Sequence, residues 1–295
     1  MCLIVFSYRE YVEYPLIFAG NRDEFHARPT APADFWRTHP DLLAGRDLKA
    51  GGTWLGVSRQ GLFATVTNYR EPIDNSISGR RSRGALVTDY LLNSVSAEAH
   101  LANLVRRAAD YSGYNLIFGS PDALYYYSNR GPKAKSSKPD ASDADDDVYA
   151  AEDGTPHAFA PDRDACANPR LHIIEPGLHG LSNEQLDTPW PKVRRAKELF
   201  RKAVEGSEPA FEPLLDLLAD SRRASNHEIP STGLSPELES RLSSIFIPGD
   251  EYGTRASTVV LMREDGLIQF AERTYGPGGV ETGTRTFEVV AGGSA

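Results

Sequence analysis

The chain has 295 residues, of which 25% are charged and 40% are hydrophobic, and its formal net charge is −9. This length accommodates one large domain or two small ones, and the negative charge argues against a protein that binds nucleic-acid backbones. The two cysteines, Cys2 and Cys166, form no disulfide framework and suit a reducing compartment. The first apolar run has only four residues, too few for a signal peptide or a membrane span. We therefore expect a cytoplasmic protein, and we take residues 1–295 as a single domain.

The N-terminal segment predicts a β-hairpin. Two short apolar runs, at residues 3–6 and 16–19, flank a polar turn. With the turn centred near residues 11 and 12, antiparallel pairing places Cys2 roughly opposite Asn21, to within about two residues. The sequence "GNRDEF" therefore lies beside Cys2, and strand alternation places Asn21 and Asp23 on one face and Arg22 on the other.

Further hairpins and helices follow in alternation. "TWLGVS" and "LFATVTNYR" predict a second hairpin, and "YNLIFG" and "LYYYSN" predict a third. Between them we expect one helix from about residue 83 and another from about residue 97 that stops before Gly113. Residues 131–165, which include "KAKSSKPDASDADDD", contain almost no aliphatic side chains and predict a mobile insertion.

The C-terminal half returns to ordered patterns. It resumes with "LHIIEPGLHGLSN", continues with helices predicted near residues 191–204, 209–220 and 235–244, and ends in the strands "RASTVVLM", "LIQFAERTY" and "TFEVV". Hairpins that alternate with helix pairs predict an α+β fold of two antiparallel sheets covered by helices.

Cys2 is the first candidate for chemistry. One interpretation is that it is a small side chain that fills a buried strand end. The other is that removal of Met1 leaves a thiol and a free α-amine on the same residue, and an amine with a pKa of about 7.7–8.0 can act as a base.

Polar residues at the ends of several apolar strands are the other candidates. Each one alone is explained by a turn cap or a surface ion pair, but together with Cys2 they supply a nucleophile, amide donors and a carboxylate for amide hydrolysis. We expect them to line one cleft at the end of the sheets: Asn21, Arg22, Asp23, Asn68, Asn183 and Arg255. The seven histidines show no H-x-x-x-H or H-x-H spacing, and nucleotide-binding glycine motifs are absent, so we predict no metal site and no nucleotide site.

Several long motifs carry a family resemblance. In chain order they are "MCLIVF", "FAGNRDEFHARP", "GGTWLGVSRQGLFATVTNYR", "GLHGLSNEQLDTPWPKV" and "YGTRASTVVLM". Together they resemble the NRDE family, also called the transport and Golgi organisation family, over almost the whole chain, with residues 131–165 as the main departure.

The resemblance implies a fold and a set of site residues. The family looks like the N-terminal nucleophile hydrolases, four-layer αββα sandwiches that include bile salt hydrolases and penicillin V acylases. By this resemblance Cys2 matches the nucleophile, Asn183 in "LSN" matches an oxyanion-hole amide, and Arg255 in "GTR" matches an arginine near the thiol. Arg22 and Asp23 fall in the region of the acylases' arginine–aspartate pair, although with a different spacing. Asn68 is a second candidate amide.

Two functions follow from these observations. The first is a cysteine hydrolase of a linear amide or acyl bond, which needs no cofactor. The alternative is a non-catalytic carrier of haem or a lipid-like ligand, because eukaryotic members of the family are linked to haem trafficking and lipid homeostasis. For that alternative His26, inside "NRDEFHARP", is the candidate axial haem ligand. Both functions predict a small-molecule ligand, and the sequence makes no prediction of the oligomeric state.

Overall fold

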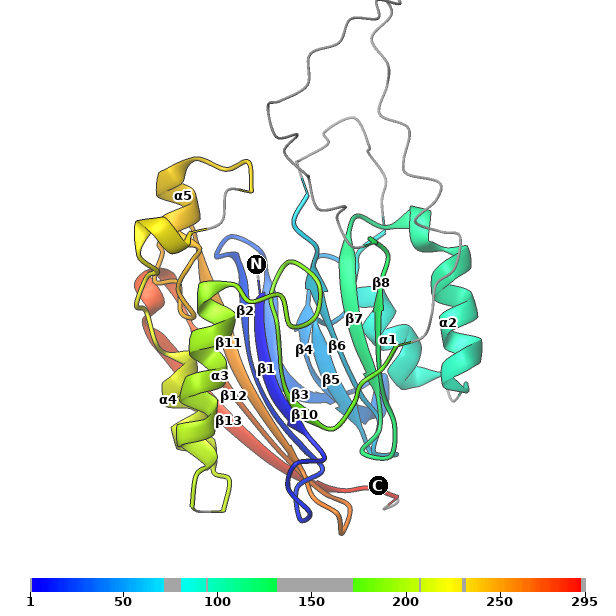
Figure 1. Ribbon diagram of the computed structural model, residues 1–295. Helices are drawn as coiled ribbons and strands as arrows, with labels where there is room; N and C mark the ends of the chain where they lie inside the picture. Colours follow the sequence, from blue (N-terminus) through cyan, green and yellow to red (C-terminus); the bar gives the residue numbers. More distant parts are fainter. Residues whose placement is uncertain are drawn as a thin grey trace, which may run out of the picture.

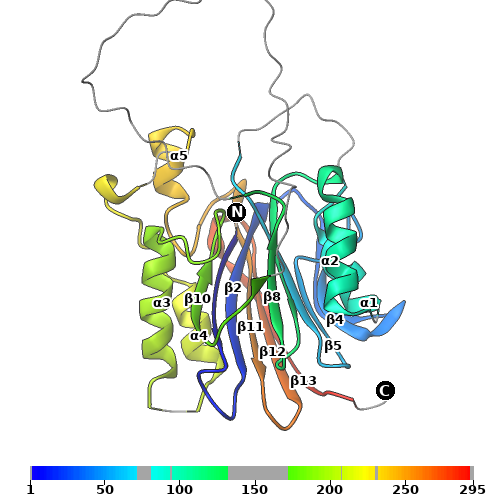
Figure 2. The ribbon, with the colours of Figure 1, turned by 45° about the vertical axis from the view of Figure 1, so that its right-hand side comes forward.

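The computed structural model describes residues 2–71, 81–93, 95–131, 172–206, 208–229 and 232–292. Within them, two antiparallel sheets stack face to face and helices cover their outer faces (Figures 1 and 2). The insertion predicted at residues 131–165 lies, apart from Gly131, outside the described residues.

The six-stranded sheet has the predicted N-terminal hairpin near its centre. Its strand order is β10, β1, β2, β11, β12 and β13. These strands comprise, in the same order, Gly177–Leu181, Cys2–Tyr8, Leu16–Phe25, Tyr252–Met262, Leu267–Tyr275 and Glu281–Val290. β10 and β2 therefore flank β1, so a segment from the middle of the chain and the second strand of the hairpin lie on either side of the strand that begins at Cys2.

The seven-stranded sheet is a meander, in which strands that follow one another in the chain pair side by side. It contains β3 to β9 in sequence order. Their bounds are Thr30–Trp36, His39–Asp47, Leu55–Ser58, Phe63–Asn68, Tyr114–Gly119, Leu124–Ser128 and His172–Ile173. The second and third predicted hairpins form β5–β6 and β7–β8, so these predictions are confirmed.

Helices cover the outer face of each sheet. α1 and α2 lie on the seven-stranded sheet, while α3 and α4 lie on the six-stranded sheet, with α5 beyond them (Figure 1). Ser96 caps α2, because its side chain accepts a hydrogen bond from the Ala99 N–H. The five helices comprise Gly84–Leu92, Ala97–Arg106, Pro191–Val204, Phe211–Leu218 and Pro236–Arg241.

Strand alternation builds three apolar layers between the four layers of structure. Ile4 and Phe6 of β1 point between the two sheets, where they pack with aromatic side chains from both. Leu3 and Val5 point to the other face and pack against α3 and α4. A third layer lies between the seven-stranded sheet and α1 and α2. The expected four-layer αββα sandwich is confirmed.

The structure corrects the sequence analysis at residues 30–47. No strand was predicted there, yet this segment forms β3 and β4. Pro32 and Pro40 interrupt the apolar pattern, and two register shifts in the β3–β4 pair disturb its alternation. Prolines and bulges are tolerated near the edge of a sheet, where fewer backbone N–H groups must pair, so propensity alone misses such strands.

Candidate active site

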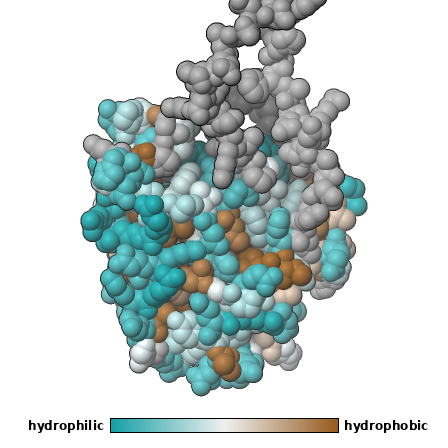
Figure 3. All heavy atoms as spheres, viewed as in Figure 1, coloured by the Kyte–Doolittle hydropathy of each residue, from teal (hydrophilic) through white to brown (hydrophobic). Residues whose placement is uncertain are grey.

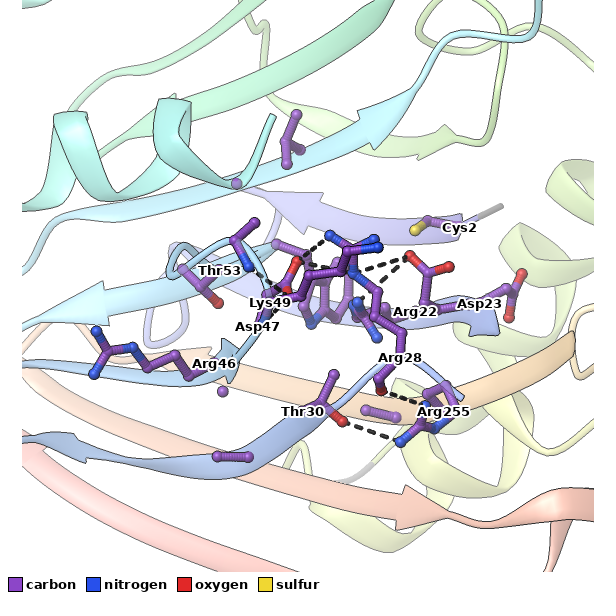
Figure 4. Close-up of a pocket in the computed structure, with 18 of the residues that line it drawn as sticks. Cys2, Arg22, Asp23, Arg28, Thr30, Arg46, Asp47, Lys49, Thr53 and Arg255 are labelled. Atoms are coloured by element: carbon purple, nitrogen blue, oxygen red, sulfur yellow. Dashed lines mark hydrogen bonds and ion pairs between the residues drawn. The ribbon is translucent and has the colours of Figure 1, made fainter. Parts of the chain in front are cut away.

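A cavity of about 860 Å³ opens between the ends of the two sheets. Cys2 lies in its wall, and the segments that surround it come from β2, β4, β6, β11 and the start of α1 (Figure 4). Of the residues predicted to line one cleft, the structure brings five into this wall, namely Cys2, Arg22, Asp23, Asn68 and Arg255. Asn21 and Asn183 are not among the lining residues.

Cys2 is the first residue of β1 and is buried at the end of that strand. It pairs with Arg22 of β2. Ser182 Oγ donates a hydrogen bond of 3.0 Å to the carbonyl oxygen of Cys2. Burial raises the pKa of the Cys2 thiol. The thiol is therefore protonated near neutral pH, and a nucleophilic role requires a base beside it.

Arg22 and Asp23 turn to different sides of β2, as the alternation predicts. Arg22 lies near Glu24 on the cavity face, with 3.6 Å between Arg22 Nη2 and Glu24 Oε2. Asp23 is buried, and its Oδ1 accepts a hydrogen bond of 2.8 Å from Thr254 Oγ1 of β11. Burial raises the pKa of the Asp23 carboxyl, while nearby positive charges, including Lys192 and Arg22, oppose this rise.

The prediction that Asn21 lines the cleft is wrong. The hairpin register differs by one residue from the expected one, so Arg22 rather than Asn21 lies opposite Cys2. Asn21 faces the helices, where its Nδ2 donates to the carbonyl oxygens of Leu218 and Ile245 at 2.8 and 2.9 Å. This side chain joins β2 to the segments after α4 and has a structural role.

The two other asparagines adjoin each other, but only Asn68 lines the cavity. Asn183 is buried, and its Nδ2 donates a hydrogen bond of 2.9 Å to the backbone oxygen of Asn68. Asn68 ends β6 and lines the cavity, and within the described part of the chain its side-chain amide has no hydrogen-bond partner. Asn68 is thus the asparagine whose amide is free to meet a ligand.

Arg255 lines the cavity, but its donors are engaged by the connection between β2 and β3. Its Nη1 donates to the backbone oxygens of Phe25, His26 and Arg28 at 2.9 to 3.2 Å. Its Nη2 donates to Thr30 Oγ1 at 3.0 Å, and Figure 4 shows the two side chains together. These partners indicate that Arg255 shapes the connection between the two sheets.

Two basic residues near the site were not predicted from the sequence. Arg83, just before α1, lines the cavity and donates from Nη1 to Gly113 O at 3.0 Å. Burial lowers the pKa of the Arg83 guanidinium, and the negative charge that Cys2 can carry opposes this shift. Lys192, in the first turn of α3, is buried, and burial lowers its pKa to about 8, opposed by the charge of Asp23. Both basic residues lie at the start of a helix. In a sequence, a basic residue at such a position is usually expected to be exposed.

The structure offers no support for haem ligation by His26. This residue is not among those that line the cavity, and burial lowers the pKa of its imidazole. No histidine lines the cavity wall as the described residues form it. In the same part of the chain, no three His, Cys, Asp or Glu side chains gather as a metal site would require.

Among the helices of the described segments, none has the length and apolar content that a bilayer crossing demands. The face seen in Figure 3 is mainly hydrophilic, and its hydrophobic residues occur in short groups.

Comparisons with known proteins found similar solved structures and similar curated sequences. Among solved structures, an N-acylethanolamine-hydrolyzing acid amidase ortholog from Caenorhabditis elegans shares 10% identity, with a TM-score of 0.47 and coverage of 88% of this chain and 92% of that chain. A mutant conjugated bile acid hydrolase from Clostridium perfringens shares 11%, with a TM-score of 0.43 and coverage of 98% and 92%.

Curated relatives are more similar in sequence. Transport and Golgi organization protein 2 homologs from Homo sapiens and Bos taurus are 32% and 31% identical, over 93% of this chain and 93% of each relative. The family model described as Transport and Golgi organisation 2 matches residues 1–277. The chain therefore belongs to the Transport and Golgi organisation 2 family, as its sequence motifs indicated.

Proposed function

We propose that the protein is a cysteine N-terminal nucleophile hydrolase that cleaves a linear amide or related acyl bond. The observation that carries the proposal is the position of Cys2, whose thiol stands at the end of β1 in the wall of a large cavity. Arg22 and Asp23 lie in the same wall, so a cation and a carboxylate accompany the nucleophile.

The reaction proceeds in two steps once the residue that precedes Cys2 has been removed. In the first, the Cys2 α-amine accepts the thiol proton while the sulfur attacks the carbonyl carbon of the amide. The carbon–nitrogen bond then breaks, the α-ammonium returns the proton to the leaving nitrogen, and a free amine departs from a thioester. In the second, water attacks the thioester with the same amine as base, which releases a carboxylic acid and restores the thiol.

The neighbouring residues have distinct roles in this proposal. Asp23 holds the α-ammonium, and the positive charge of Lys192 favours the ionised form of the Asp23 carboxyl. Arg22, opposite Cys2 in the hairpin, favours the thiolate. The free amide of Asn68 donates to the oxyanion of the tetrahedral intermediate, while Asn183 holds the end of β6 through the Asn68 carbonyl.

The carrier alternative would use the same cavity without chemistry. Pockets for lipid-like ligands are lined mostly by apolar side chains, whereas this wall contains many charged residues. The cavity lining therefore favours a polar substrate, and the carrier becomes one outcome of the test.

The test is the mass of the intact protein after incubation with a β-lactone, which acylates a catalytic cysteine. We expect one acyl adduct on Cys2 in the processed chain. Cys2→Ser should lose most of the amide hydrolysis and Cys2→Ala all of it, whereas Cys166→Ala should retain both adduct and turnover. Full activity in a chain that keeps Met1 would exclude the mechanism, because the amine would then be blocked. Ligand binding that survives Cys2→Ala, with no adduct and no turnover, would identify a carrier.

A further inference from the structure

The cavity wall is rich in cations although the whole chain is acidic. Four carboxyl residues, Asp23, Glu24, Asp47 and Glu272, contribute to the lining. Against them stand seven basic residues, namely Arg22, Arg28, Arg46, Lys49, Arg81, Arg83 and Arg255. Cations gathered in a concave site focus their field on a ligand, so the imbalance favours a negatively charged one.

The carboxyl groups leave little negative charge for a ligand to meet. Asp47 Oδ2 accepts hydrogen bonds from Arg28, at 2.6 Å from Nη2 and 3.0 Å from Nε. Glu24 lies 3.6 Å from Arg22 and 3.8 Å from Arg28. Burial raises the pKa of Glu272 to about 7, so part of the charge of this carboxyl is neutralised near pH 7.

Several of the cations lack an acidic partner. Within the described residues, no carboxylate oxygen lies within 4 Å of Arg83, Arg81 or Lys49. Arg83 is the most enclosed of the three, and the hydrogen bond to Gly113 O leaves most of its five donors for other partners. A guanidinium held in this way presents a planar set of donors that fits an oxyanion.

The fold places Lys49 and Arg83 on one wall of the cavity. The β4–β5 connection that carries Lys49 packs directly on the start of α1, where Thr53 N donates to Gly84 O at 3.3 Å. Cys2 belongs to the other sheet, and Figure 4 shows it at one end of the labelled residues, with Thr53 and Arg46 at the other. A ligand can therefore contact the thiol with one group and this wall with another.

We propose that the substrate carries an oxyanionic group, a carboxylate or a phosphate, which Arg83 binds with help from Lys49 and Arg81 while the scissile bond lies at Cys2. The inference rests on the proposed hydrolase and specifies its substrate class. Charge-assisted hydrogen bonds to a partly buried arginine change affinity by about ten- to a hundredfold, so the effect is measurable.

The experiment compares four amides that share one acyl chain. Two leaving amines are anionic, glycine and O-phosphoethanolamine, and two are their neutral counterparts, glycinamide and ethanolamine. We expect the processed protein to prefer at least one anionic amide over its counterpart about tenfold or more in kcat/KM, with the preference falling as salt rises. The glycine and phosphoethanolamine arms distinguish a carboxylate site from a phosphate site.

Arg83→Gln should reduce that preference about ten- to a hundredfold, and the exposed Lys49→Gln about threefold. Lys202→Gln, on the exposed face of α3 beside Glu198, is the matched control and should leave the preference unchanged. Equal slowing of all four amides by Arg83→Gln, with a shifted pH profile, would mean that Arg83 acts on the thiol and would overturn the inference. So would hydrolysis without any anionic preference.

A binding measurement separates this inference from the proposed hydrolase. Calorimetry with Cys2→Ala and the N-acylglycine should give binding that Arg83→Gln weakens by the same factor. If no amide is hydrolysed but this binding persists, the hydrolase fails and the anion site stands. If amides are hydrolysed but binding is indifferent to charge, the hydrolase stands and the anion site fails.

Discussion

Glu272 illustrates how one side chain joins the two sheets beneath the cavity. It projects from β12, and its Oε1 accepts a hydrogen bond of 2.6 Å from the Ala33 N–H of β3. Gly45 of β4 leaves the space that the carboxyl needs, because a Cβ there would lie 3.2 Å from Glu272 Oε2. The carboxyl is almost fully buried, and burial raises its pKa to about 7, against the opposing charges of Arg22 and Arg285.

The raised pKa of Glu272 predicts that the stability of the protein depends on pH. In the folded protein the carboxyl keeps its proton up to about pH 7, whereas unfolded glutamate loses it near 4.5. The folded state therefore binds more protons between these values, and the free energy of unfolding falls as pH rises through this window, by about 3 kcal/mol in all.

The measurement is chemical denaturation of the wild type and Glu272→Gln at pH 5 and pH 8. A glutamine oxygen can still accept from Ala33 but carries no charge. We expect Glu272→Gln to gain stability relative to the wild type as pH rises, by up to about 3 kcal/mol at pH 8. A difference between the two proteins that stays constant with pH would contradict the shifted titration of Glu272.

At the scale of secondary-structure elements, the cavity wall depends on the contact between the β4–β5 connection and the start of α1. Gly52 and Gly84 allow the two backbones to approach so closely that a Cβ at Gly52 would lie 2.5 Å from the Gly84 carbonyl carbon. Because the obstructing atoms belong to the backbone, no side-chain rotation can relieve the clash. The connection and the helix would have to separate, and Lys49 and Arg83 would separate with them.

Gly52→Ala should therefore affect both stability and the site. We expect a loss of about 1–3 kcal/mol and a weaker preference for anionic amides. Gly276→Ala is a suitable control, since a Cβ there would meet its nearest neighbour, Thr282, at an ordinary 3.4 Å. Denaturation curves and the four-amide comparison measure the two effects. If both glycine variants behave alike, the close approach of the backbones is not what holds this wall.

At the scale of the whole molecule, three apolar layers account for the packing of the described residues. Each sheet contributes side chains to the layer between the sheets and to a second layer against its own helices. Arg130 immediately precedes the predicted insertion, and its Nη2 lies 2.8 Å from Glu71 Oε2.

We predict that the insertion adds nothing to stability. Its composition offers too little apolar surface to offset the entropy lost on ordering. Deletion of residues 131–165, with Arg130 joined to Cys166 through a short turn, should leave the melting temperature nearly unchanged in a thermal scan. A fall of several degrees would show that the segment packs against the domain.

The sequence by itself determined the α+β class, the pairing of the three hairpins and the position of Cys2 at a strand start. These features depend on local periodicity and turn chemistry, which a single sequence displays. Its motifs also determined the family. The periodic helix at residues 191–204 was predicted with its observed bounds, whereas β3 and β4 were missed because prolines and bulges hide their alternation.

Only the tertiary structure decided which side chains share the cavity. A shift of one residue in the hairpin register moved Asn21 to the helix side and set Arg22 opposite Cys2, because strand side chains alternate with a period of two. The partners of Arg255 and the free amide of Asn68 depend on contacts between segments far apart in the chain. Arg83 joins the site only because the two sheets stack and bring α1 to the end of β1, a long-range arrangement that no local pattern records.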